Sequence, residues 1–202
     1  MTMIARMLTA AIVMSSASLA VHAQTPTMRI RGTIQSVEGS TLSVTTREGP
    51  VLKVALNDPL TVLTVKKVEP SAVTAGTYIG AAAQPGPDGE LTALEVLVFS
   101  EAARGTGEGH FPWDLAPNSS MTNATVDAVV QGATGNLLTL SYKGGSVKVR
   151  VPPGVPVVTP APAAREDLKP GQAVFFSAAR APDGTLSAGR IFVAKDGVAP
   201  PM

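Results

Sequence analysis

The residues best suited to chemistry lie together in one short segment near the middle of the chain. It contains Glu108, His110, Asp114 and Met121, with Trp113 among them. Imidazole and carboxylate groups together suit Zn²⁺ or Cu²⁺, whereas imidazole and thioether suit Cu⁺. One hypothesis is therefore a copper or zinc site in which His110 binds the metal, either with Asp114 or Glu108 or with Met121.

The same segment carries two aromatic side chains, Phe111 and Trp113, which flank Pro112. A buried aromatic side chain contributes a large apolar area, roughly 150 to 250 Å². We expect Phe111 and Trp113 to anchor this segment against the rest of the protein or to present a surface for a ligand or partner.

Few residues are arranged for catalysis. A serine nucleophile needs a neighbouring base, and His110 is the only histidine after position 22. No Gly-x-Ser-x-Gly nucleophile elbow is present. We therefore expect a protein that is not an enzyme, with no catalytic residue and no cofactor other than the copper or zinc of the metal hypothesis. An envelope hydrolase without a recognisable motif is the third functional hypothesis.

The chain around this segment is duplicated. Residues 76–98 align without a gap with residues 171–193 at an offset of 95, and both stretches share a Pro-Asp-Gly-x-Leu-x-Ala core, which begins at Pro87 and at Pro182. Asp-Gly between two apolar runs is typical of a hairpin turn. Self-similarity of this kind predicts two copies of one supersecondary unit.

Alternating apolar residues predict the strands of each copy. The first copy shows alternation around Ile30, Leu42, Val54, Tyr78 and Leu91, and residues 69–75 fit one helical turn that ends at Gly76. Three strands, a short crossing and two further strands form the element order of the OB barrel. We predict an all-β protein of two tandem OB-like barrels, with domain 1 at 28–99, a Gly-rich and aromatic linker at 100–122, and domain 2 at 123–195.

The residues around the two hairpins also carry a family resemblance. Leu168-Lys169-Pro170-Gly171 precedes Asp183-Gly184-Thr185-Leu186 in the second copy, and Val73-Thr74-Ala75-Gly76 precedes Asp88-Gly89-Glu90-Leu91 in the first. With these segments the chain resembles a family of exported bacterial β-barrel repeat domains of unknown function. The linker segment 107–115 is similar to that of chains labelled as metal-transporter components. The resemblance implies an exported OB-like fold and assigns no site residue.

Residues 1–23 have the layout of a secretory signal: Arg6, an apolar run, and small residues up to Ala23. We expect cleavage after Ala23 and a periplasmic location. No later segment has the roughly 20 consecutive apolar residues that span a bilayer, and the absence of Cys excludes disulfides and thiolate metal sites.

The charge of the chain limits the classes of partner that we expect. The 16 basic and 15 acidic residues leave no net charge once the signal peptide with Arg6 is removed, and nucleic acids require a basic surface. The leading hypothesis is a non-catalytic binding or envelope-associated module. Its partner would be an envelope protein, a polymer or a small ligand, with no role for nucleic acid.

Overall fold

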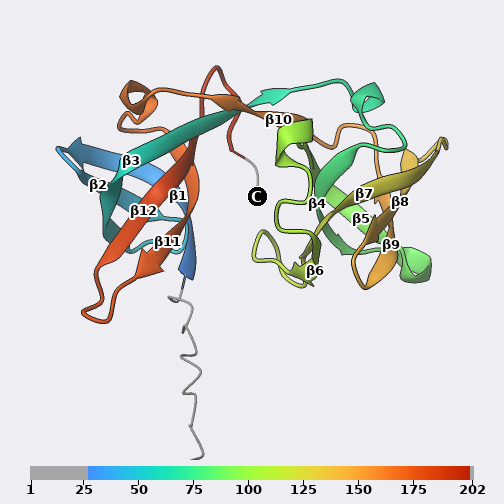
Figure 1. Cartoon of the computed structure of the whole chain (residues 1–202), viewed down its shortest axis with the longest axis horizontal. Coiled ribbons are helices and arrows are strands. Elements are labelled where there is room, and N and C mark those ends of the chain that lie inside the picture. Colours follow the sequence, from blue (N-terminus) through green and yellow to red (C-terminus); the bar gives the residue numbers. More distant parts are fainter. Residues whose placement is uncertain (1–26, 201–202) are drawn as a thin grey trace, which may run out of the picture.

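The computed structural model describes residues 27–200, so the predicted signal peptide, 1–23, lies outside the described part. The predicted all-β class is confirmed, because strands join into one continuous network and the helices found in this described part are all short 3₁₀ turns. No helix within residues 27–200 is long and apolar enough to cross a membrane. Figure 1 shows two lobes joined by a narrow crossing of strands.

The first barrel is a closed ring of five strands. β1 pairs antiparallel with β2 and with β11, β2 pairs antiparallel with β3, and β12 lies antiparallel to β11 and parallel to β3. These strands are β1 (Thr27–Glu38), β2 (Thr41–Thr46), β3 (Val51–Lys67), β11 (Ala173–Arg180) and β12 (Leu186–Val193). The ring has the OB-like closure that the sequence predicts.

The second barrel closes in the same way. β7 pairs antiparallel with β8 and with β4, β8 pairs antiparallel with β9, and β5 lies antiparallel to β4 and parallel to β9. Its strands are β4 (Tyr78–Pro85), β5 (Leu91–Val98), β7 (Ser120–Val130), β8 (Asn136–Tyr142) and β9 (Gly145–Val151).

The two sequence copies exchange strands, which corrects the predicted domain boundaries. Domain 1 at 28–99 and domain 2 at 123–195 do not each form a barrel. β4 and β5 of the first copy complete the barrel of β7, β8 and β9, whereas β11 and β12 complete the barrel of β1, β2 and β3. The second barrel is therefore a continuous segment, 78–151, inserted between the two parts of the first. The predicted linker, 100–122, connects two strands of this second barrel.

The reason for the exchange is visible in β3. It has 17 residues, and although its register with β12 shifts between Leu56 and Thr61, it continues past the end of that pairing and so carries the chain away from its own barrel. Its last residues pair antiparallel with β10 (Val157–Pro162), which has the same place in the second copy. The paired ends of β3 and β10 form the crossing between the lobes in Figure 1.

Turns occur where the sequence predicts them. In the two hairpins, Gly89 and Gly184 have φ values of 73° and 88°, a region that glycine enters without steric cost. The helical turn expected at 69–75 is the 3₁₀ turn η1 (Pro70–Ala72), and η4 (Arg165–Asp167) has the equivalent place in the second copy. The residues after these turns, Val73 and Leu168, are buried in the barrel cores. Two other short turns are η2 (Pro87–Gly89) and η3 (Glu101–Ala103).

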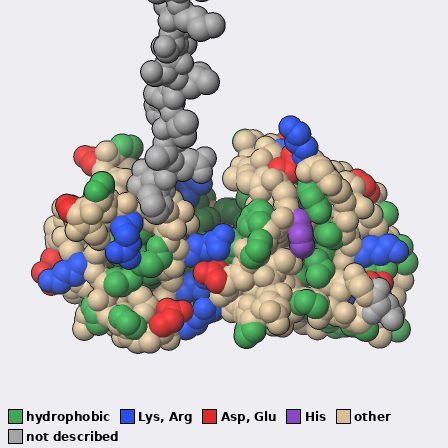
Figure 2. Space-filling model, turned by 90° about the horizontal axis from the view of Figure 1, so that it is seen from below, with side chains coloured by type: hydrophobic (Ala, Val, Ile, Leu, Met, Phe, Trp, Pro, Cys, Tyr) green, Lys and Arg blue, Asp and Glu red, His purple; other side chains and the backbone are tan. Residues whose placement is uncertain are grey.

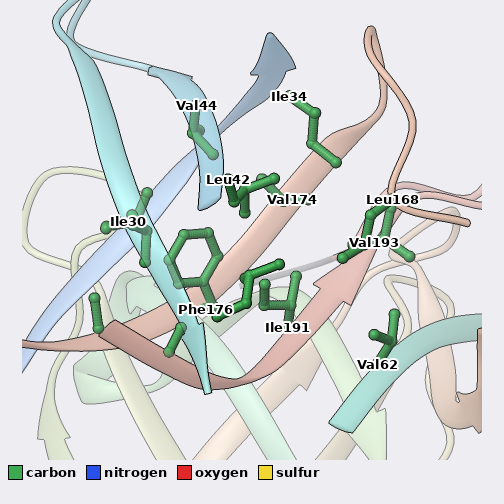
Figure 3. Close-up of a cluster of buried hydrophobic side chains, with 14 of the residues drawn as sticks. Ile30, Ile34, Leu42, Val44, Val62, Leu168, Val174, Phe176, Ile191 and Val193 are labelled. Carbon is green, nitrogen blue, oxygen red and sulfur yellow. The ribbon is translucent and has the colours of Figure 1, made fainter. Parts of the chain in front are cut away.

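Each barrel has its own apolar core. In the first, the ring of Phe176 on β11 lies among Ile30, Leu42 and Ile191 from three other strands (Figure 3). The second core surrounds Ile79, Leu138 and Leu140 and contains more alanines, namely Ala81, Ala83, Ala93 and Ala124. Both cores contain side chains from strands of both copies, so burial of apolar area stabilises the exchanged arrangement.

A third apolar cluster holds the barrels together. Buried residues at its centre come from the crossing, from β4, β5 and β7 of the second barrel, and from β11 of the first: Val65, Val158, Ala82, Leu97, Met121 and Phe175. Phe111, Trp113 and Leu115 of the linker pack against them. The predicted role of the two aromatic residues as anchors of the linker is consistent with this packing.

Candidate functional site

His110 lies on β6 (Gly109–Pro112), a short strand of the linker that pairs with β7. Its Nδ1 is 2.8 Å from the Thr122 hydroxyl, and its ring stacks on Tyr142 with centroids 6.1 Å apart. These contacts place the imidazole on the outer face of the second barrel.

Met121 points to the opposite face of the same strand pair. Side chains alternate along a strand, and Met121 neighbours Thr122, the residue that faces His110. The Met121 side chain is 3% exposed and packs in the cluster between the barrels. His110 and Met121 are therefore not placed to bind one metal ion.

The two predicted carboxylate ligands are engaged elsewhere. A Glu108 carboxylate oxygen accepts a hydrogen bond from the Lys143 backbone N–H at 2.8 Å, and the Asp114 carboxylate lies 2.8 Å from the Arg31 guanidinium. Within the described residues, no three His, Cys, Asp or Glu side chains are grouped to hold a metal ion.

The predicted partner residues, Phe111 and Trp113, are half-buried between the barrels. The ring of Trp113 meets Phe111 and Phe175 edge-on, with centroid distances of 5.9 and 6.2 Å. Because Phe175 belongs to the first barrel, Trp113 is the aromatic bridge between the linker and that barrel. These rings contribute mainly to packing.

Arginines of the first barrel surround this bridge. The Arg29 guanidinium lies 4.0 Å from the centre of the Trp113 ring, and that of Arg31 lies 4.7 Å from the centre of the Phe175 ring. Arg47 donates hydrogen bonds to the backbone carbonyls of Asp114 and Leu115, at 3.0 and 3.1 Å. The first barrel is thus held to the linker by basic side chains.

A cleft of about 700 Å³ opens beside these arginines, between the two barrels. We call it the inter-barrel cleft, and its volume is in the range of small-molecule sites. Its polar lining includes Arg31, Arg47, Lys67 and Glu95, and its apolar lining includes Phe175 and Val158. Residues 197–200 of the C-terminal segment form part of one wall. Figure 2 shows basic and acidic side chains gathered in the hollow between the lobes.

The guanidinium of Arg31 interacts with several charged groups near the cleft. Burial lowers its pKa, the hydrogen-bonded carboxylate of Asp114 raises it, and the charges of Arg47 and Arg29 lower it. An arginine stays protonated in proteins, so Arg31 is a fixed positive charge beside one carboxylate and two further guanidinium groups.

The equivalent surface of the second barrel is covered. Thr33 and Arg31 line the cleft, and their counterparts in the second copy are Thr125 and Asn123. The Asn123 amide donates to the carbonyls of Thr106 and Gly107, at 3.3 and 3.1 Å.

Other contacts complete this cover. The hydroxyl of Tyr78, the counterpart of the cleft residue Ala173, donates to the Thr106 carbonyl at 3.1 Å. The Arg104 guanidinium reaches the Gly76 carbonyl at 2.9 Å. The linker thus covers a surface of the second barrel. The equivalent surface of the first barrel is open and faces the cleft.

Sequence reasoning missed Arg31, Arg47 and Lys67, because two of them occupy outward positions of ordinary strands and Arg47 lies in the turn after β2. One signal was available: where the first copy has Arg29 and Arg31, the second copy has Met121 and Asn123. Differences between duplicated units indicate where one unit has acquired its own role.

The chain matches no protein-family model, no curated protein and no solved structure. The family resemblance of the hairpin segments accordingly stays a prediction, and any functional assignment rests on the geometry of this chain.

Proposed function

We propose that the protein is an exported, periplasmic, non-catalytic binding module whose small-ligand site is the inter-barrel cleft. The observation that carries this proposal is the difference between the two copies. Equivalent surfaces are covered by residues 104–107 on the second barrel and left open beside fixed arginines on the first.

The cleft is well suited to binding because its charged groups are already held in place. Asp114 fixes Arg31, and two linker carbonyls fix Arg47. Preorganised side chains lose little conformational entropy when a ligand arrives, which favours affinity. The alternative hypothesis, copper or zinc handling by the linker, draws no support from the positions of His110 and Met121.

The proposal is tested by native mass spectrometry of the protein isolated from the periplasm of its own producer. We expect a small molecule to be retained by the parent protein and lost in Thr45→Trp, because Thr45 lines the cleft and a large side chain there fills it.

The matched control is Ser141→Trp, at the equivalent position of the second copy, which does not line the cleft. It should keep the bound molecule. A parent protein that carries no ligand, or a ligand that survives Thr45→Trp, would contradict the proposal.

A further inference from the structure

We infer that the ligand of the inter-barrel cleft is a small amphiphilic anion: a compact organic acid with one carboxylate, sulfonate or phosphate group and an apolar body. This inference rests on the proposed binding function and adds the chemical class of the ligand. Three observations support it: the positive charge of the lining, the hydrogen-bond donors that remain available on its cations, and its apolar residues.

The charged side chains of the lining are three basic and one acidic: Arg31, Arg47, Lys67 and Glu95. Asp114 and Glu48, which pair with the two arginines, are not part of the lining. The surface that a ligand meets is therefore positive, and a partly enclosed positive surface attracts anions.

Lys67 is the cation best placed to contact such a ligand. It lies on the crossing where β3 pairs with Val158 of β10, at the edge of the cleft, and its side chain is exposed. Among residues 27–200, no acidic group lies within 4.0 Å of its ammonium group. Its three donors can turn toward an anion without breaking an existing ion pair.

Arg47 faces the same space from β2 and the turn that follows it. Its guanidinium is held by the carbonyls of Asp114 and Leu115, while the side chain stays partly exposed. A guanidinium has five donors, and because Nε also bonds to Glu48, two donors are left for an acidic group of a ligand. Thr33, Thr45 and Thr46 add hydroxyl groups to this side of the cleft.

Apolar residues of the lining lie beside these polar groups, since Phe175 pairs with Arg31 and Val158 pairs with Lys67. They include Phe175, Val174, Val158 and Pro156, with Val198 and Pro200 from the C-terminal segment. An inorganic ion would leave these residues uncovered. A ligand with an apolar body removes them from water, which stabilises the complex by about 25 cal/mol per Å² buried.

The only tryptophan of the chain makes the inference testable with the intact protein. Trp113 contacts Arg31 and Phe175, both of which line the cleft, so its fluorescence should respond to occupancy. We would titrate the protein with sodium octanoate and with 1-octanol, which share an apolar chain and differ in charge. Calorimetry under the same conditions measures binding independently of the fluorescence.

We expect octanoate to bind more tightly than octanol and its affinity to fall as salt is added. Lys67→Gln should weaken octanoate roughly fivefold, the effect of one partly solvated ion pair, and leave octanol unchanged. The matched control is Lys66→Gln, the neighbouring residue, which does not line the cleft. Arg47→Gln, checked for native folding by circular dichroism, provides a second variant.

Equal affinity for octanoate and octanol would overturn the anionic class while leaving a binding cleft in place. Absence of octanoate binding by calorimetry, or tighter binding of a triglutamate peptide than of octanoate, would also overturn the inference. The binding function itself is judged separately, by the retained molecule in the mass spectrum and its loss in Thr45→Trp.

Discussion

Val65 of β3 pairs with Pro160 of β10 at the centre of the crossing, and these two residues hold the same position in the two sequence copies. The two flanking pairs, Thr64 with Ala161 and Lys66 with Thr159, are equivalent to each other, because Thr159 is the counterpart of Thr64 and Ala161 that of Lys66. The crossing is therefore arranged about an approximate two-fold axis that relates the two barrels. The exchange of strands is a consequence of this symmetry, because each copy extends through the crossing into the other barrel.

Strand exchange predicts which engineered cysteines will form a disulfide. Thr27 on β1 faces Ala179 on β11, so Thr27→Cys with Ala179→Cys should cross-link on mild oxidation. The chain contains no natural Cys to compete. Mass spectrometry of the oxidised protein measures the product.

The control for this pair is Thr27→Cys with Gln84→Cys. Gln84 is the first-copy counterpart of Ala179, and it would face Thr27 if each copy formed its own barrel. Cross-linking of this second pair, or failure of the first, would contradict strand exchange.

Removing the aromatic bridge should destabilise the whole protein. Trp113→Ala deletes contacts with Phe111 and Phe175 between linker and barrel. Because Trp113 is only half-buried, we expect a loss of about 2 kcal/mol, below the usual cost of a fully buried tryptophan. Denaturant unfolding followed by circular dichroism measures it. Trp113→Phe should recover most of the stability, and an alanine variant as stable as the parent would disprove the role of the bridge.

A surface ion pair gives the protein a specific pH dependence. The Asp167 carboxylate lies 2.8 Å from Lys195, and this hydrogen bond, with that from the Ala164 N–H, lowers the pKa of Asp167. The same partner raises the pKa of Lys195. The pair therefore stabilises the fold above the unfolded pKa of Asp, about 3.9, and below that of Lys, about 10.4.

Asp167→Asn should consequently lower the melting temperature at neutral pH. The difference from the parent should shrink as the pH falls through the lowered pKa of Asp167, and again as it rises through the raised pKa of Lys195. Glu166→Gln, at the exposed adjacent position, is the control and should show no such profile. A constant difference at all pH values would mean that Asp167 acts without its charge.

The metal hypothesis gives a prediction about His110. Because His110 and Met121 face opposite sides of the β6–β7 pair, they should not cooperate in binding copper. We expect His110→Ala and Met121→Leu each to leave the affinity for Cu⁺ and Zn²⁺ within about twofold of the parent value, within the usual scatter of such free energies. Titration calorimetry with competing chelators measures both ions. A tenfold loss of metal affinity in either variant would support the metal-site hypothesis.

The linker illustrates what rare residues can and cannot indicate. His110, Trp113 and Met121 stand out in the sequence, yet the structure directs them to an outer face and to the packing between the barrels. Arg47 resembles any polar turn residue and Lys67 any outward strand residue, and only their convergence from distant segments makes them cleft residues. Spacing along the chain predicts contacts within a strand or hairpin, and it contains no information on contacts between barrels.

The strands, the hairpins and the OB-like class follow from local patterns in the sequence. These features depend on only a few neighbouring residues, so they can be predicted from short segments. Examples are the alternation around Ile30 or Leu138 and the turn glycines Gly89 and Gly184. The partners of β1 were decided by the tertiary structure. Both copies offer the same turn and core residues, so β4 and β11 satisfy local rules equally. The long β3 strand and the burial of apolar area at the crossing select β11, and that choice creates the cleft.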